Sequence, residues 1–258
     1  MRLKAKVIIA TGTTSGIGLA CAKRFAKEGA KVVMCARSEE KGKVQEKELL
    51  DLGYDVTFIK CDVSKKSDVD KVVIKTIEKY KRIDGVLNNA GINHSASFFD
   101  TTEEDWDKVM SVDLKGTVLM SQAVAKEMVR QGNGGSIVNV SSVTAQIALS
   151  DQVPYCSAKG GVNQLTRAMA VALGQNNIIV NSIGPGPIMT ELMQRVVVNK
   201  EKDEELIRRM PLGRKGSPEE IAGVAVFLMT EDASFITGQC IYADGGRMIQ
   251  SFPRYMER

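Results

Sequence analysis

Short apolar runs and longer segments with helical periodicity alternate along the whole 258-residue chain. The apolar runs have the length of buried strands, and each precedes a segment whose apolar residues recur at the spacing of an amphipathic helix. Parallel strands need long crossover connections, which are usually helices and run right-handed. The alternation therefore predicts an α/β fold, in which a doubly wound parallel sheet of about seven strands carries helices on both faces.

One domain is expected over residues 1–258, because no low-complexity linker divides the chain and its length is near the upper limit for one core. Ser64 is the expected N-cap of the third helix. After the sixth strand, short helices are expected to about residue 210, and residues 187–210 are the candidate substrate lid. The expected strands are 7–10, 31–36, 56–61, 83–87, 136–140, 178–183 and 239–242, and the expected helices are 16–28, 38–52, 64–81, 102–131, 155–173 and 218–229.

Composition excludes several classes of function. Lys and Arg number 35 against 31 Asp and Glu, and these charges are spread along the chain, so no nucleic-acid partner is expected. No apolar run is long enough to span a bilayer or to act as a signal peptide, which predicts a cytoplasmic protein without membrane contact. The five cysteines form no C-x-x-C pair, three of them lie in apolar surroundings, and His94 is the only histidine, so no metal is expected.

A glycine-rich turn follows the first apolar run and opens the first expected helix. It reads Thr11-Gly12-Thr13-Thr14-Ser15-Gly16-Ile17-Gly18, which is the spacing G-x3-G-x-G. Glycines there allow a tight turn and a close approach of the backbone to a pyrophosphate, whose charge the helix N-terminus favours. Such glycines also serve packing alone, so this turn predicts a Rossmann-type dinucleotide site only together with other motifs.

Ser142, Tyr155 and Lys159 are the most specific set in the sequence. Tyr155 and Lys159 are four residues apart, so they share one face of a helix, and Ser142 ends the preceding strand. A free tyrosine has a pKa near 10, and a lysine ammonium or an oxidised nicotinamide nearby favours the phenolate. The set therefore indicates proton transfer by Tyr155 at a carbonyl or alcohol.

These motifs together resemble the short-chain dehydrogenase/reductase family. Asn88-Asn89-Ala90-Gly91 after the fourth strand and Asp62-Val63 after the third also match, and the resemblance extends from residue 6 to residue 246. It implies hydride transfer between a nicotinamide and a secondary alcohol or carbonyl. Tyr155 is then the general acid/base, Ser142 holds the substrate oxygen, and Lys159 supports Tyr155 and binds the nicotinamide ribose. The implied cofactor-binding residues are Gly12, Thr14, Ser15, Gly16, Ile17, Gly18, Arg37, Ser38, Asp62, Val63, Asn89, Ala90, Gly91, Tyr155, Lys159, Pro185, Gly186, Ile188 and Thr190.

The end of the second strand bears on the choice between NAD and NADP. A carboxylate there would bind the ribose 2′-hydroxyl and repel a 2′-phosphate. This chain has Arg37 and Ser38 instead, and a guanidinium can bind a phosphate with two hydrogen bonds. NADP is therefore the expected cofactor, with NAD possible, since Glu39 and Glu40 weaken the positive field and Ser15 stands where many NADP-preferring relatives carry a basic residue.

One position departs from the family pattern. Asp113 stands where the family commonly has the Asn of a V-N-L-x-G stretch, which is thought to hold a water linking the lysine to solvent. A carboxylate can still accept hydrogen bonds from water. Its charge near Lys159 would keep the lysine protonated and partly cancel its effect on Tyr155. We therefore count Asp113 with the catalytic residues and expect a working enzyme with a raised pH optimum.

The sequence indicates the substrate less directly. The pocket is expected to use residues 144–154 and 187–210 and His94, with Gln146 and Gln152 as hydrogen-bonding groups and Ile147, Leu149 and Met193 as apolar walls. His94 is equally well explained as a surface residue. The C-terminal stretch is similar to that of sugar and polyol dehydrogenases, with a 3-oxoacyl-thioester or broad carbonyl reductase as the alternative.

Two further questions stay open at this stage. An alternative function from a different class is a nucleotide-binding scaffold with weak catalysis. Asp113 is the one sequence feature that favours this alternative. Relatives generally form tetramers, which implies a homotetramer. The tail residues Arg247, Arg254 and Arg258 are suited to an acidic substrate, a neighbouring subunit or solvent.

Overall fold

The computed structural model describes residues 1–191, 193 and 200–249, and within them the chain folds around one parallel sheet. Seven strands lie in the order β3-β2-β1-β4-β5-β6-β7, and every neighbouring pair is parallel. The predicted fold class is thereby confirmed. The strands are β1 (Val7–Thr11), β2 (Lys31–Ala36), β3 (Val56–Lys60), β4 (Gly85–Asn88), β5 (Gly135–Val140), β6 (Ile178–Pro185) and β7 (Cys240–Ala243).

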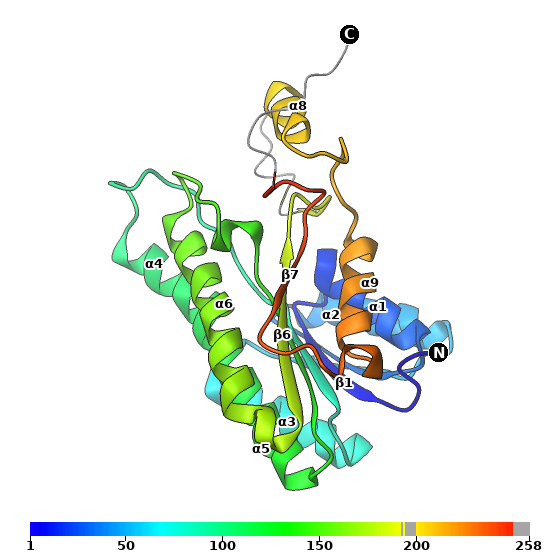
Figure 1. The fold of residues 1–258 in the computed structure, drawn as a ribbon. Coiled ribbons are helices and arrows are strands. Elements are labelled where there is room, and N and C mark those ends of the chain that lie inside the picture. The colour runs from blue at the N-terminus through cyan, green and yellow to red at the C-terminus, as the bar shows by residue number, and fades with distance from the viewer. Residues whose placement is uncertain (192, 194–199, 250–258) are drawn as a thin grey trace.

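Helices cover both faces of this sheet (Figure 1). Alternate residues of β1 point to opposite faces: Ile8 packs with Phe25 and Ile221 of one helical layer, and Ile9 packs with Val72 and other side chains of the second layer. The first layer holds α1 (Gly16–Lys27), α2 (Glu39–Asp51) and α9 (Pro218–Leu228). The second holds α3 (Lys66–Tyr80), α5 (Gly116–Gln131) and α6 (Val153–Leu173), with α4 (Glu103–Val109) packed against α6.

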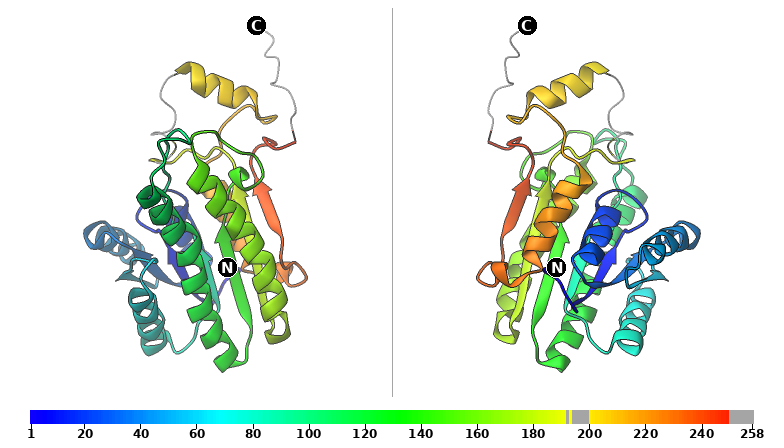
Figure 2. Two further views of the ribbon diagram at one scale, coloured as in Figure 1. Left: turned by 90° about the vertical axis from the view of Figure 1, so that its left-hand side faces the viewer. Right: turned by 90° about the vertical axis from the view of Figure 1, so that its right-hand side faces the viewer.

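The strand order reverses direction at β1, which lies between β2 and β4. The connections that leave the carboxyl ends of β1 and β4 therefore diverge and leave a crevice, where open parallel sheets bind their ligands. The glycine-rich turn follows β1, and the Asn-Asn-Ala-Gly turn follows β4, so both predicted motifs lie at this edge. The helix α8 (Lys200–Arg208) lies beyond the carboxyl ends of β6 and β7 (Figures 1 and 2).

Two expected helices differ in detail. The third begins at Lys66 with Lys65 as its N-cap residue, so the prediction of Ser64 as N-cap was wrong. The Ser64 backbone N–H and hydroxyl both donate to Asp62 Oδ1, at 3.1 and 2.7 Å, and hold this serine in the preceding turn. The helix expected over 102–131 is interrupted by a π-helical turn, Met110–Lys115, between α4 and α5.

The remaining expectations concern the lid, the cysteines and the membrane. Part of the predicted lid, residues 192 and 194–199, lies outside the described residues. Cys21, Cys35 and Cys61 are buried free thiols, as the apolar surroundings of three cysteines indicated.

Among the described residues, no helix is long and apolar enough to cross a membrane. The same residues contain no group of three or more side chains that could hold a metal ion.

Candidate active site

The predicted Ser–Tyr–Lys set comes together where β5 ends against α6. Tyr155 and Lys159 lie on α6, and the Lys159 ammonium is 5.4 Å from the centre of the Tyr155 ring. Lys159 Nζ donates to the carbonyl oxygen of Val140 at 3.0 Å, and the Ser141 hydroxyl donates to the Lys159 carbonyl at 3.3 Å. Ser142 follows directly, and its hydroxyl accepts a hydrogen bond from the Thr144 backbone N–H at 3.1 Å. The end of β5 thus fixes both the lysine and the serine beside Tyr155.

Opposing influences act on the Tyr155 hydroxyl. Burial raises its pKa, while the positive charge of Lys159 and a hydrogen bond with Ser142 lower it, and the negative charge of Asp113 raises it again. The net direction in the free protein is upward. Lys159 and Ser142 are therefore the groups that favour the phenolate, and Asp113 opposes them.

Asp113 lies on the π-helical turn and is fully buried, with Oδ2 3.1 Å from Lys159 Nζ. Its Oδ1 accepts a hydrogen bond from the Ile92 backbone N–H at 2.8 Å. Burial alone would lower the pKa of Lys159, but Asp113 and Tyr155 outweigh it and raise that pKa. Burial raises the pKa of Asp113, and the Lys159 charge lowers it in part. The predicted proximity of Asp113 to Lys159 is thus present in the structure.

Gly91 leaves the space that this ion pair occupies. A Cβ atom at this position would lie 2.8 Å from Asp113 Oδ2 and 3.4 Å from Lys159 Nζ. Any side chain here would push apart the groups that surround Tyr155. The glycine of the Asn-Asn-Ala-Gly turn is therefore required by packing against Asp113 and Lys159.

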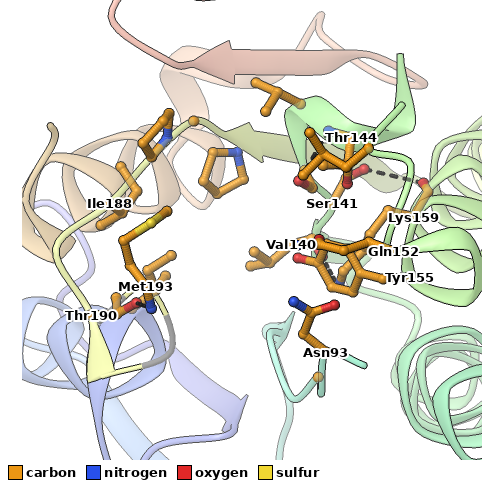
Figure 3. A pocket seen from close by; sticks show the side chains of 18 of the residues that line it. Asn93, Val140, Ser141, Thr144, Gln152, Tyr155, Lys159, Ile188, Thr190 and Met193 are labelled. Carbon is orange, nitrogen blue, oxygen red and sulfur yellow. Dashed lines mark hydrogen bonds between the residues drawn. The ribbon is translucent and has the colours of Figure 1, made fainter. Parts of the chain in front are cut away.

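A pocket of about 250 Å³ opens beside Tyr155. Ile188, Thr190 and Met193 line one side of it, and Tyr155 and Lys159 lie on the opposite side (Figure 3). The predicted Gln152, Ile147, Leu149 and Met193 all line this pocket. Leu206, from the predicted 187–210 segment, lines it as well. Sequence reasoning did not assign Asn93 to the pocket; Arg247, named only among the basic tail residues, lines it too.

Two predicted pocket residues lie elsewhere. Gln146 lines a separate cavity with Arg167 and Tyr242, because the 3-10 turn after Ser142 directs it to the β7 edge of the sheet. His94 lines the neighbouring cleft, not the pocket, and its Nε2 is 3.4 Å from Asp105 Oδ2 of α4. Both placements correct the sequence-based prediction.

The neighbouring cleft has a volume of about 870 Å³ and meets the pocket at Gly91 and Asn93, which line both. Apart from Glu191, its lining residues come from the first 112 residues of the chain, whereas most of the pocket wall comes from residues 140–247. Nine predicted cofactor residues line the cleft: Gly12, Thr14, Ser15, Arg37, Ser38, Asp62, Val63, Ala90 and Gly91. The pocket contains Ile17, Asn89, Tyr155, Lys159, Pro185, Gly186, Ile188 and Thr190.

The glycine-rich turn is fastened to the turn after β4. The Thr11 hydroxyl accepts hydrogen bonds from the backbone N–H groups of Asn89 and Ala90 at 2.9 and 3.0 Å. Gly12 has a φ of +71°, and a Cβ atom there would lie 2.7 Å from Asn89 Nδ2. A Cβ at Gly18 would collide with the Gly12 carbonyl oxygen. Gly18 therefore packs against the glycine-rich turn and does not line the cleft. Gly16 borders a smaller cavity with Thr190.

These features fit a dinucleotide. No side chain caps the N-terminus of α1, where Ser15 is the N-cap residue, so its backbone N–H groups are available to a phosphate. Arg37 and Lys41 add positive charge to the wall of the cleft. Glu39, which was expected from the sequence to weaken this field, has its carboxylate 3.8 Å from Lys60 Nζ and does not line the cleft. Lys41 was missed because it lies one helical turn into a charged helix.

Comparison with known proteins agrees with this geometry. A family model described as enoyl-(acyl carrier protein) reductase matches residues 12–247. The 3-oxoacyl-(acyl-carrier-protein) reductase FabG of Thermotoga maritima is 41% identical over 249 residues, which cover 96% of this chain and 100% of that protein. L-rhamnose 1-dehydrogenase (NAD(P)(+)) of Sphingomonas sp. strain SKA58 is 37% identical over 96% of this chain and 98% of its own length.

Solved structures give the same result. A gluconate 5-dehydrogenase from Burkholderia cenocepacia in complex with NADP and tartrate superposes with a TM-score of 0.92, at 32% identity and with 96% of this chain and 98% of that chain covered. The chain belongs to the short-chain dehydrogenase/reductase family, whose members are oxidoreductases that bind NAD(P). The resemblance inferred from the motifs is therefore confirmed.

Proposed function

We propose that this protein interconverts a secondary alcohol and a carbonyl compound with NADP, and that Tyr155 is the general acid/base. The observation that carries the proposal is the position of Tyr155. Its ring faces a pocket that joins the large cleft, with Lys159 and Ser142 beside it. A carbonyl oxygen in this pocket and a nicotinamide at the junction with the cleft would lie next to each other.

The bound dinucleotide supplies the hydride in reduction and accepts it in oxidation. In reduction the Tyr155 hydroxyl donates its proton to the substrate oxygen, and in oxidation the Tyr155 phenolate accepts the proton of the alcohol. The Ser142 hydroxyl, which is buried at the end of β5, holds the substrate oxygen near Tyr155. The Lys159 ammonium favours the phenolate and is itself kept protonated by Asp113. Asp113 is thus a positioning residue that acts through Lys159.

Arg37 supports the choice of NADP over NAD. Its side chain lines the cleft beside Ser38, and no carboxylate among the described residues lies within 4.0 Å of its guanidinium. A 2′-phosphate there would receive two hydrogen bonds from Arg37 and would attract Lys41. Gly12, Thr14, Ser15 and the other predicted residues of the cleft would hold the rest of the dinucleotide.

A sugar or polyol is the proposed substrate class. The full-length similarity to L-rhamnose 1-dehydrogenase and to gluconate 5-dehydrogenase supports it. A 3-oxoacyl thioester is the second candidate, supported by the 41% identity to FabG and by the apolar walls Ile147, Leu149 and Ile188. A scaffold with weak catalysis would not require Ser142 and Lys159 to be fixed beside Tyr155.

We also propose a homotetramer and a substrate lid over residues 187–210. Val118 of α5, Val171 of α6 and Phe235 near β7 are apolar and exposed, and Val171 is 86% exposed. Subunit contacts through these elements would cover such side chains. Light scattering in solution tests the assembly, and a monomer would exclude it.

The reaction is tested by following reduced-cofactor absorbance. Purified protein is mixed with NADP or NAD and a panel of sugars, polyols and secondary alcohols, and with reduced cofactor and a panel of ketones and 3-oxoacyl thioesters. Turnover with NADP on one class supports the reaction and selects the substrate class. Tight cofactor binding without turnover on any substrate would contradict the proposal and favour the scaffold.

A further inference from the structure

Arg247 lines the pocket beside Tyr155, and its backbone is held by a hydrogen-bonded turn. It follows a turn in which Gly245 and Gly246 have φ angles of +64° and +83°, and its backbone N–H donates to the Asp244 carbonyl at 3.2 Å. The Asp244 carboxylate accepts hydrogen bonds from the backbone N–H groups of Gly246 and Met248 at 2.9 and 2.8 Å. This hydrogen-bonded turn returns the chain toward the pocket after β7 and holds Arg247 at its wall.

The same turn is packed against the segment before α9. The Leu212 backbone N–H donates to the Gly245 carbonyl at 3.1 Å, and a Cβ atom at Gly246 would lie 2.7 Å from the Pro211 ring. Gly246 therefore allows a close contact that a larger residue would prevent. This contact helps to set the position of the Arg247 backbone.

Among the described residues, no carboxylate forms an ion pair with the Arg247 guanidinium, whereas most of the other arginines there have such a partner. Among the described residues, the arginines with a carboxylate within 4.0 Å are Arg2, Arg24, Arg82, Arg130, Arg208, Arg209 and Arg214. Those without one in this part of the chain are Arg37, Arg167 and Arg247, and Arg37 lines the cofactor cleft. Burial lowers the pKa of Arg247, the nearby charge of Arg209 lowers it further, and Asp244 raises it in part. A partly desolvated, unpaired cation is costly unless an anion binds to it.

The rest of the pocket restricts what that anion can be. Apart from Arg247, the charged residues at its wall in the described part of the chain are Asp113 and Lys159, which pair with each other. The walls also include the apolar side chains of Ile188, Met193 and Leu206. A volume of about 250 Å³ is small for a ligand pocket and favours a small substrate. In a small substrate, an anion that reaches Arg247 lies close to the reacting carbon.

We propose that Arg247 binds a carboxylate of the substrate, so that the protein acts on hydroxy and oxo acids in which the acid group and the reacting carbon belong to one small molecule. The inference rests on the proposed function, and it narrows the proposed sugar and polyol class to members that carry an acid group. A sugar acid satisfies it, whereas a neutral sugar or polyol does not. Arg247 would receive the carboxylate with two parallel hydrogen bonds, which a guanidinium provides and an ammonium does not.

The test compares each acid with a neutral counterpart of nearly the same shape. Reduction of acetoacetate is measured against methyl acetoacetate, and oxidation of D-gluconate against D-glucitol. The variants are Arg247→Gln, Arg247→Lys and, as a control with the same loss of charge, Arg214→Gln, whose side chain pairs with Glu220 at 2.7 Å and does not line the pocket. The wild type should favour the acid of each pair that it accepts.

A hydrogen bond to a charged group predicts the size of the effect. Arg247→Gln should lower kcat/KM for the acid by about 10- to 100-fold, mostly through KM, and should change the value for the neutral compound by less than about threefold. Arg247→Lys should recover only part of the loss, and Arg214→Gln should behave as wild type. An equal loss for acid and neutral compounds, or a wild type without preference for the acid, would overturn the carboxylate site while leaving the proposed reaction intact.

Binding without turnover separates this inference from the proposed function. Calorimetry with NADP-loaded protein compares succinate with its neutral analogue succinamide. Succinate binding that Arg247→Gln weakens at least about tenfold supports the anion site even if no substrate is turned over. Succinate and succinamide that bind alike, or a variant that binds succinate as well as wild type does, would overturn it.

Discussion

Replacing Asp113 with Asn removes a buried negative charge from the surroundings of Tyr155 and keeps nearly the same side-chain shape. Asp113 Oδ2 is 3.1 Å from Lys159 Nζ, which is 5.4 Å from the centre of the Tyr155 ring. Oδ2 therefore lies at most about 8.5 Å from that ring centre. The amide oxygen of Asn can still accept the hydrogen bond that the Ile92 backbone N–H gives to Asp113 Oδ1, so the local fold should persist.

The magnitude follows from this distance. At an effective dielectric constant of about 20, a unit charge at about 8.5 Å changes the free energy of ionising Tyr155 by about 2 kcal/mol, or about 1.4 pH units. Asp113 raises the pKa of Tyr155, so its removal lowers that pKa. Loss of the carboxylate also lowers the pKa of Lys159, which weakens the lysine's pull on Tyr155 and offsets part of the gain. The expected net shift is about one pH unit downward.

Alcohol oxidation requires the Tyr155 phenolate, so at saturating cofactor kcat/KM rises with pH through the pKa of Tyr155 in the enzyme–cofactor complex, where the positive charge of the oxidised nicotinamide lowers that pKa. The assay is this profile between about pH 5 and 10, measured for wild type and Asp113→Asn at saturating cofactor. Asp107→Asn, which changes an exposed carboxylate on α4, is the control and should leave the midpoint in place. An Asp113→Asn midpoint that stays unmoved or shifts upward would refute the electrostatic argument.

Three further substitutions test the rest of the site. Tyr155→Phe should lower kcat by at least about 100-fold while calorimetry shows unchanged NADP binding, and retained turnover would exclude Tyr155 as the acid/base. Arg37→Gln should raise KM for NADP about 10- to 100-fold and leave KM for NAD within about threefold; parallel changes would show that Arg37 does not meet the 2′-phosphate. Gly18→Ala places a Cβ against the Gly12 carbonyl oxygen and should lower the free energy of unfolding by about 1–3 kcal/mol in urea titrations, together with weaker NADP binding. The matched change Gly53→Ala meets no atom within 4 Å, although its φ of +81° adds backbone strain, so it should leave NADP binding unchanged; equal binding losses in both variants would contradict a local effect at the turn.

Local sequence patterns were sufficient to predict the features that neighbouring residues determine. Tyr155 and Lys159 share a helix face because they are four residues apart. The glycine turn follows β1 because Gly12 and Gly16 adopt positive φ angles, which a strand does not use. The order of apolar runs also predicts the parallel sheet. These features depend on neighbours in the chain, and the structure places them as expected.

Features that depend on distant contacts were not predictable in the same way. The π-helical turn at Met110–Lys115 carries Asp113 toward Ile92 and Lys159, and no residue pattern in that stretch marks it. Similarly, His94 lies near Asp105 and not in the pocket because α4 packs there, which the sequence of the loop does not specify. Two other residues were misplaced for local reasons: Asp62 holds Ser64 in the preceding turn, and the 3-10 turn after Ser142 directs Gln146 to the β7 edge of the sheet.

The cleft and the pocket are lined by largely different parts of the chain, so substrate preference and cofactor preference can be altered separately. The cleft is built almost wholly by the first 112 residues, whereas Glu191 is its one lining residue from beyond them in the described chain. Most of the pocket wall comes from residues 140–247, and the two cavities share Gly91 and Asn93. We therefore expect that exchanging residues 187–247 between relatives transfers substrate preference. The choice between NAD and NADP should stay that of the recipient protein, because the residues that line the cleft are nearly all retained.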